Sequence, residues 1–140
     1  MSDRKYWIAV VSKEHVEWGV AGGFMQACHG KQAPLKRMQK GDGVIFYSSK
    51  ERMTDTEKLQ TFTAIGEVAD DLIYPFSMSD TFVPYRRNIK FKECRAVSII
   101  PLINQLTFIA DKRSWGYPFR YGFLEISEGD FNLIGAQMLF

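Results

Sequence analysis

The sequence predicts a mainly β domain with a few short helices, in the α+β class, built on a small barrel or a strongly bent sheet. Short apolar runs rich in β-branched and aromatic residues alternate with turn residues along most of the chain. Helical spacing of apolar residues is confined to short stretches near the two ends. The chain has 140 residues and shows neither an internal repeat nor a linker, so we expect a single domain over residues 1–140.

Four segments are expected to form strands. Three are apolar runs in the first half, at Tyr6–Val11, Val44–Tyr47 and Phe62–Val68. Gly66 within the third run marks a bulge or a close approach of another backbone. A long β stretch is expected over Arg87–Ile100, because apolar residues alternate with lysines near its start.

Helices are expected on either side of this β region. Lys13–Ala21 has helical spacing, and Gly22 with Gly23 supplies its end. A terminal helix is expected over Phe131–Met138. Ser127 is its predicted N-cap, followed three positions later by the acidic Asp130. A further helical turn is expected near Pro101, and Lys50–Leu59 is expected to be an exposed loop.

The bulk composition is that of a folded globular protein, with 46% hydrophobic and 24% charged residues. No apolar run approaches the ~20 residues that a membrane-spanning helix needs. Two cysteines, Cys28 and Cys94, do not make a disulfide framework. We therefore expect a cytoplasmic protein that does not enter a membrane.

Residues 81–120 interleave positive charge with aromatic rings. This segment contains eight Lys or Arg and two acidic residues, a net charge of +6, although the whole chain carries only +2. Cations neutralise phosphates and flat rings stack on bases, so the pattern is typical of nucleic-acid binding. The alternative is a pair of strands with a solvated basic outer face and an apolar inner face.

Sequence signals for catalysis are missing. The chain has no Walker-type phosphate loop, no dinucleotide-binding fingerprint and no nucleophile elbow. The adjacent pair Cys28 and His29 lacks the spacing of a zinc site, and Asp70 with Asp71 fits a solvated turn. We therefore expect neither a metal nor a cofactor, and an enzyme is the less favoured class.

A series of short motifs, in order along nearly the whole chain, resembles the EVE domain. In the first half these are Tyr6–Ser12, His15, Gly22–Phe24 with Gln26, His29–Lys31, Pro34–Leu35, Lys40–Asp42, Val44–Ser48 and Phe62–Val68. In the second half they are Pro84–Arg87, Leu106–Ile109, Trp115–Tyr117, Phe119, Arg120, Gly122 and Asp130–Phe131. The chain is similar to stand-alone bacterial EVE proteins, which form an uncharacterised protein family.

This resemblance implies a PUA-like fold, which is a bent β-barrel flanked by helices. EVE domains are similar to YTH domains, which hold a modified base in an aromatic cage, and to RNA-binding PUA and ASCH domains. The implied function is non-catalytic recognition of a modified nucleobase in DNA or RNA. The alternative is a protein that binds a small molecule or free nucleotide, or an enzyme acting on nucleotides, at the same barrel mouth.

A base pocket needs flat walls, and the candidates are Trp7, Trp18, Tyr47 and Trp115. Tyr47 and Trp115 each precede a turn residue, so we expect them at strand ends, where they form part of an aromatic recess. Trp7 lies within an apolar strand, and its alternative is a core position.

The remaining candidates read the base edge or hold the phosphates. Gln26 and Ser48 are the predicted edge readers, and Gly23 allows close approach of a backbone. Their alternative is ordinary hydrogen bonding in turns and caps. The predicted phosphate ligands are His29, Lys31, Arg86, Arg87 and Arg120.

Overall fold

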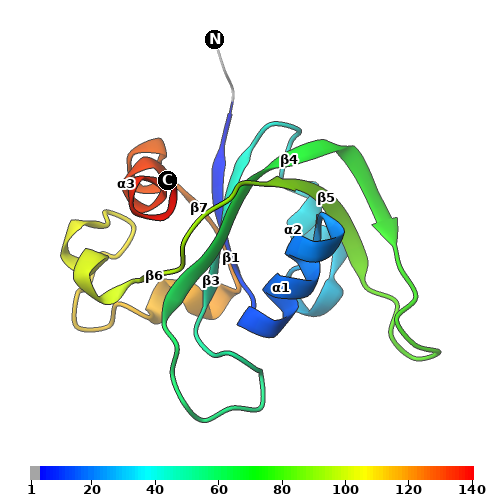
Figure 1. The fold of residues 1–140 in the computed structure, drawn as a ribbon, viewed down its shortest axis with the longest axis horizontal. Coiled ribbons are helices and arrows are strands. Elements are labelled where there is room, and N and C mark those ends of the chain that lie inside the picture. The colour runs from blue at the N-terminus through cyan, green and yellow to red at the C-terminus, as the bar shows by residue number, and fades with distance from the viewer. Residues whose placement is uncertain (1–3) are drawn as a thin grey trace.

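The computed structural model describes residues 4–140, which form one mixed sheet with helices on both faces (Figure 1). The strands are β1 (Tyr6–Val10), β2 (Phe24–Met25), β3 (Gly43–Ser48), β4 (Thr61–Pro75), β5 (Tyr85–Phe91), β6 (Val97–Ser98) and β7 (Phe123–Ile126). The α-helices are α1 (Lys13–Gly22), α2 (Gln32–Lys36) and α3 (Glu128–Met138). Three 3₁₀ helices complete the elements: η1 (Cys28–Gly30), η2 (Ile100–Gln105) and η3 (Tyr117–Tyr121).

The sheet has the strand order β2-β5-β4-β3-β1-β7, and β6 also pairs with β4. Strands β1 and β3 are parallel, and the other pairs are antiparallel. This arrangement confirms the predicted α+β class. Within residues 4–140 the sheet does not close on itself, so the bent-sheet prediction describes it better than a closed barrel.

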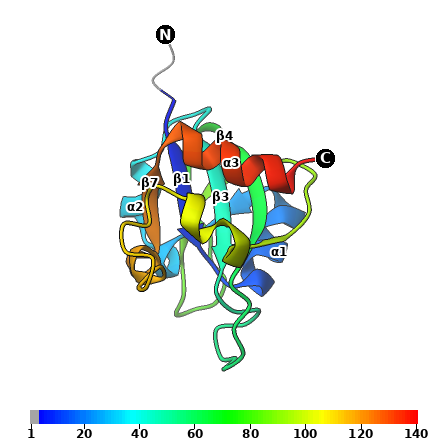
Figure 2. The ribbon, with the colours of Figure 1, turned by 90° about the vertical axis from the view of Figure 1, so that its left-hand side faces the viewer.

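Each face of the sheet carries its own hydrophobic core. Side chains alternate along β1, so that Tyr6 and Ile8 join one core whereas Trp7 and Ala9 join the other. Figures 1 and 2 show α3 on the first face and α1 with α2 on the second.

Local sequence signals predicted several of these elements. Helix α1 ends at Gly23, which adopts a left-handed φ of 75° and donates its N–H to the carbonyl of Gly19 at 2.7 Å. Ser127 Oγ accepts from the N–H of Asp130 at 3.1 Å, so the predicted N-cap is confirmed. At Gly66 an added Cβ would lie 2.5 Å from the carbonyl oxygen of Lys90, which confirms a close backbone approach.

Two predicted boundaries are wrong. Asp70 and Asp71 lie inside β4 rather than in a turn, because a register shift between Val68 and Ile73 lets the strand continue past them. The predicted stretch from 87 to 100 is broken after Phe91. The chain there leaves the β4 ladder, bridges Cys94 to Leu139, and returns to β4 only as the two-residue β6.

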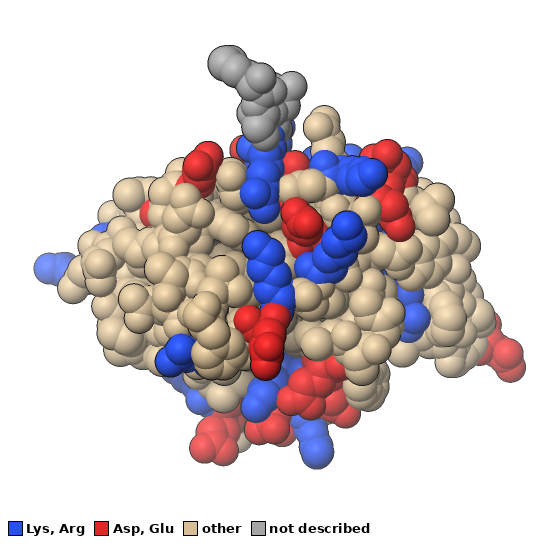
Figure 3. Space-filling model, turned by 45° about the horizontal axis from the view of Figure 1, so that its top comes forward, with Lys and Arg blue, Asp and Glu red and all other residues tan. Residues whose placement is uncertain are grey.

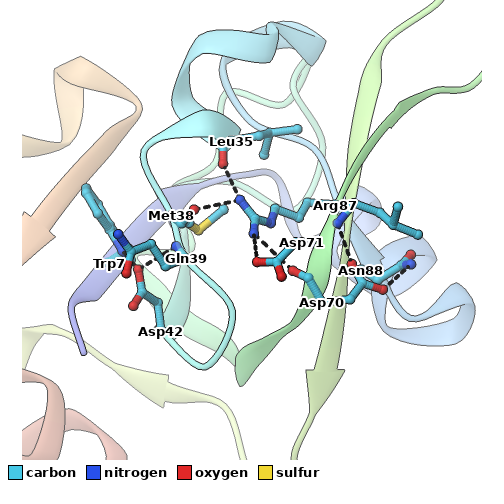
Figure 4. Close-up of polar contacts among 10 residues, drawn as sticks. Trp7, Leu35, Met38, Gln39, Asp42, Asp70, Asp71, Arg87 and Asn88 are labelled. Carbon is cyan, nitrogen blue, oxygen red and sulfur yellow. Dashed lines mark hydrogen bonds and ion pairs between the residues drawn. The ribbon is translucent and has the colours of Figure 1, made fainter. Parts of the chain in front are cut away.

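Asp42 joins the first strand to the turn before β3. Its carboxylate accepts from the Trp7 indole N–H at 2.9 Å and from the Gln39 backbone N–H at 2.9 Å (Figure 4). It also accepts from the Lys5 backbone N–H at 3.1 Å. The Trp7 ring also stacks on Phe123, with centroids 4.9 Å apart. Trp7 is therefore a core residue.

Arg87 of β5 is a buried cation that ties α2 to the sheet. Its Nη1 donates to the carbonyls of Leu35 and Met38 at 2.8 and 2.7 Å, and its Nη2 donates to the carbonyl of Asp70 at 3.0 Å (Figure 4). Nη2 also lies 4.0 Å from the carboxylate of the exposed Asp71. Burial lowers the pKa of Arg87, and the nearby carboxylates oppose this shift.

We predict that Arg87→Met lowers the free energy of unfolding by about 3 kcal/mol or more, because it removes a charged donor from each of three carbonyl oxygens. Chemical denaturation measures the change. The matched control is Arg95→Met, which makes the same replacement at an exposed residue and should cost about 0.5 kcal/mol or less. Equal losses in the two variants would show that the Arg87 contacts do not stabilise the fold.

Candidate functional site

A cavity of about 660 Å³ opens between α1, the β2–η1 segment and the hairpin that joins β4 to β5. Six aromatic side chains take part in its lining: Trp18, Phe24, Phe46, Phe76, Phe82 and Phe91. The polar and charged lining residues are Ser12, His15, Gln26, His29, Ser49, Lys50 and Arg86. A mostly apolar cavity of this size with a few convergent polar groups is typical of a small-molecule or base site.

Four of the residues predicted from the sequence meet at this cavity, namely Trp18, Gln26, His29 and Arg86. Trp18 projects from α1, is 49% exposed, and lies with its ring centroid 4.9 Å from that of His15. A half-exposed indole at the edge of a cavity is available for stacking.

Arg86 is held between two rings at one side of the cavity. Its guanidinium carbon lies 3.7 Å from the ring centroid of Phe24 and 3.7 Å from that of Phe76. Its Nε donates to Gln26 Oε1 at 2.9 Å. The residue is only 8% exposed, and burial lowers its pKa.

This contact fixes the orientation of the Gln26 amide. Arginine has only donors, so the atom of Gln26 that faces Nε must be the carbonyl oxygen. The amide NH₂ of Gln26 then points away from Arg86 and supplies two donors at the cavity lining.

Ser12 is a lining residue that the sequence reasoning missed. It occupies the N-cap position of α1, yet its side chain makes no capping hydrogen bond. Its Oγ is buried and has no partner among the described residues. A serine just before a helix is usually a capping residue, and the sequence alone does not show whether its hydroxyl makes the capping hydrogen bond.

The η1 wall has unusual backbone geometry. Cys28 and His29 have φ values of 48° and 62°, and Gly30 follows at 83°. A Cβ at Gly30 would lie 2.4 Å from the Cβ of Pro84, so this position requires glycine. Left-handed conformations in non-glycine residues cost about 1–3 kcal/mol each and often occur at functional sites.

Cys28 belongs to the same wall of the cavity. Burial raises the pKa of its thiol, with Lys31 opposing the shift, so the thiolate is disfavoured near neutral pH. Its Sγ lies 3.7 Å from the carbonyl oxygen of Tyr121 as a weak donor.

Tyr47, Ser48 and Trp115 lie away from the cavity. The Tyr47 ring is buried and stacks on Phe119 with centroids 4.1 Å apart. Trp115 also packs edge-on against Phe119, at 6.5 Å, so the two predicted wall residues meet in the core beneath η3. Ser48 Oγ donates to the carbonyl of Val11 at 2.7 Å and lies 2.8 Å from Thr63 Oγ1.

Some cations of residues 81–120 are held by contacts within the protein. Arg87 is 3% exposed and bonded to carbonyls, and Lys112 Nζ donates to two carbonyls at 2.8 Å each. The exposed Arg120 lies over the ring of Tyr117 at 5.5 Å, and Lys31 is exposed just after η1. Figure 3 shows basic and acidic side chains interleaved on the face near the N-terminus.

Gly23 does not line the cavity. It caps α1, and its carbonyl accepts from the N–H of Ile89 at 2.9 Å. Across residues 4–140, His, Cys, Asp and Glu never gather in threes that could hold a metal ion. In the same range every helix is too short or too polar to cross a membrane.

We predict that Tyr47 contributes to loss of stability in alkali. Burial raises the pKa of Tyr47 from 10.0 to about 12. The folded state therefore retains the phenol proton more tightly, and this contribution is complete below pH ~10 and disappears as the pH rises through about 12. Unfolding measured across that range should show a loss of ~2–3 kcal/mol that Tyr47→Phe lacks. The matched control is Tyr117→Phe at an exposed ring, and equal slopes for the two variants would contradict the assignment.

Relatives with high sequence identity cover almost the whole chain. The sequence is 52% identical over 128 residues to a UPF0310 protein in the gntR 5′ region of Bacillus licheniformis, covering 91% of this chain and 87% of the relative. It is 44% identical over 133 residues to the UPF0310 protein YdcG of Bacillus subtilis, covering 95% and 91%.

Solved structures share the fold at low sequence identity. The YTH domain of Zygosaccharomyces rouxii MRB1, solved in complex with N6-methyladenosine RNA, superposes with a TM-score of 0.61 at 12% identity, covering 97% of this chain and 87% of that one. Protein Atu2648 of Agrobacterium tumefaciens gives 0.57 at 17% identity, covering 93% and 90%. The EVE domain model matches residues 5–137, and the chain therefore belongs to the EVE domain family.

Proposed function

We propose that this chain is a non-catalytic nucleic-acid-binding module that recognises a modified nucleobase in DNA or RNA. The observation that carries the proposal is the aromatic cavity of about 660 Å³ with Trp18, Gln26, His29 and Arg86 in its lining. A flipped base needs a recess of this kind, with flat apolar walls and a few polar groups that read its edge.

The likeness to a YTH domain supports base recognition over the binding of another small molecule in this cavity. The YTH neighbour was solved with N6-methyladenosine RNA, so one protein with this sheet arrangement holds a modified base. In this chain we assign two tasks to residues that line the described cavity. The aromatic rings stack on the base, and the Gln26 amide forms hydrogen bonds with its edge.

Backbone contacts are assigned to basic and polar side chains around the cavity. Lys50 and His29 line it, and the exposed Lys31 follows η1. These side chains come from two segments, the loop after β3 and the η1 region, and basic groups on two segments suit contacts to the phosphates beside an extruded nucleotide. Arg120 on η3 is a further candidate, because Cys28 of η1 contacts the carbonyl of Tyr121.

We predict that Trp18→Ala reduces the preference for a modified over an unmodified oligonucleotide by about tenfold or more, because it removes the stacking surface. A panel of modified oligonucleotides and matched unmodified ones, titrated by fluorescence anisotropy, identifies the preferred base first. The same titrations with the variant then give the loss of preference.

The matched control is Tyr117→Ala, which truncates a similarly exposed ring outside the cavity lining. Its preference should equal that of the unaltered protein. An unaltered protein that binds every modified and unmodified oligonucleotide equally would refute the proposed function.

Salt dependence separates this function from the binding of a free nucleotide or another small molecule. We predict that log K for an oligonucleotide falls linearly with log salt concentration, with a slope of about one unit per phosphate contact. Replacing Lys50 and Lys31 together by Ala should reduce that slope by roughly two units. Tight binding of a free nucleoside together with a flat salt response for the oligonucleotide would favour the small-molecule alternative.

A further inference from the structure

We infer that the cavity selects uncharged modified bases and rejects cationic ones, through the fixed positive charge of Arg86 and the donor edge of Gln26. The inference rests on the proposed function and deepens it, because it names the chemical class of the ligand. Three observations carry it: the charge balance of the lining, the use of the aromatic faces, and the orientation of two polar groups.

The lining carries positive charge without compensation. Arg86 and Lys50 belong to it, whereas Asp and Glu are missing from its residues in the described chain. The described residues include no carboxylate that forms an ion pair with Arg86, and the side chain is only 8% exposed. A charge that water screens poorly acts strongly on a ligand a few ångströms away.

The aromatic faces that would attract a cation are already occupied. Cages for cationic ligands work because ring faces are negative. Here the Arg86 guanidinium lies 3.7 Å from the ring centroids of both Phe24 and Phe76, so these two faces are matched to the protein's own cation. A ligand in the cavity meets the remaining rings, including that of Trp18, by stacking.

The Gln26 amide favours a ligand that accepts hydrogen bonds. Arg86 holds the Gln26 carbonyl, so Gln26 offers its NH₂ donors. Unprotonated ring nitrogens and carbonyl oxygens of a neutral base meet this requirement, and a base methylated and protonated at that edge does not.

Isomeric methylated bases test the inference at constant size and composition. N6-methyladenine is neutral near pH 7, whereas 1-methyladenine carries a positive charge, and 5-methylcytosine and 3-methylcytosine form a second such pair. Oligonucleotides that differ only in this base are titrated near neutral pH and low salt. We expect at least one neutral isomer to bind about tenfold or more tightly than its cationic partner.

A single substitution should weaken this selection. In Gln26→Glu the NH₂ donors become a carboxylate beside Arg86, so that the lining loses donors and net positive charge. The preference for the neutral isomer should fall by about tenfold. The matched control, Gln137→Glu, makes the same change at an exposed position on α3, which covers the other face of the sheet, and should leave the preference unaltered.

Each outcome decides between the two proposals. Equal or tighter binding of the cationic isomers by the unaltered protein overturns the charge selection but leaves base recognition intact. Failure to prefer any modified oligonucleotide over its unmodified match removes base recognition, and the selection with it. Retention of the full neutral preference in a folded Gln26→Glu variant, with melting temperature as the check, would show that Gln26 does not set it.

Discussion

The buried guanidinium of Arg87 is the contact on which the arrangement around the cavity depends. It donates to the carbonyls of Leu35 and Met38, at the end of α2 and just after it, and to that of Asp70 in the bulged part of β4, so it joins two regions that are distant in the sequence. A single side chain with a rigid set of donors thereby fixes α2 against the sheet. Helix η1 ends at Gly30, and the next residue, Lys31, is the N-cap of α2. Fixing α2 therefore also constrains the η1 wall of the cavity, which carries His29.

Adjacent arginines on β5 have different surroundings because consecutive side chains of a strand leave it on opposite sides. Arg87 meets the carbonyls of α2, and Arg86 meets the rings of Phe24 and Phe76. The sequence shows two neighbouring cations in a basic segment and favours phosphate binding for both. Their difference lies in partners such as Gln26 for Arg86 and Leu35 for Arg87, which lie 60 and 52 positions away and which no local pattern reveals.

Helix ends and caps could be predicted because neighbouring residues determine them, whereas contacts between residues distant in the sequence could not. The end of α1 at Gly23 and the cap at Ser127 follow from nearby residues, and both agree with the structure. Tyr47 was placed at an open strand end because a turn residue follows it, but η3 brings Phe119 over its ring. Trp18 and Gln26, which were proposed from their residue types, both lie in the cavity lining, and their role in base binding stays a prediction.

The cavity concentrates features that a stable core would avoid. Two non-glycine residues in left-handed conformations, an unpaired buried hydroxyl and an arginine without a carboxylate all lie along its lining. Each costs free energy that the two cores on either side of the sheet must offset. Selection for stability alone does not account for an unpaired hydroxyl at Ser12 and an arginine without a carboxylate partner in one lining, so their presence together supports a role in binding a ligand.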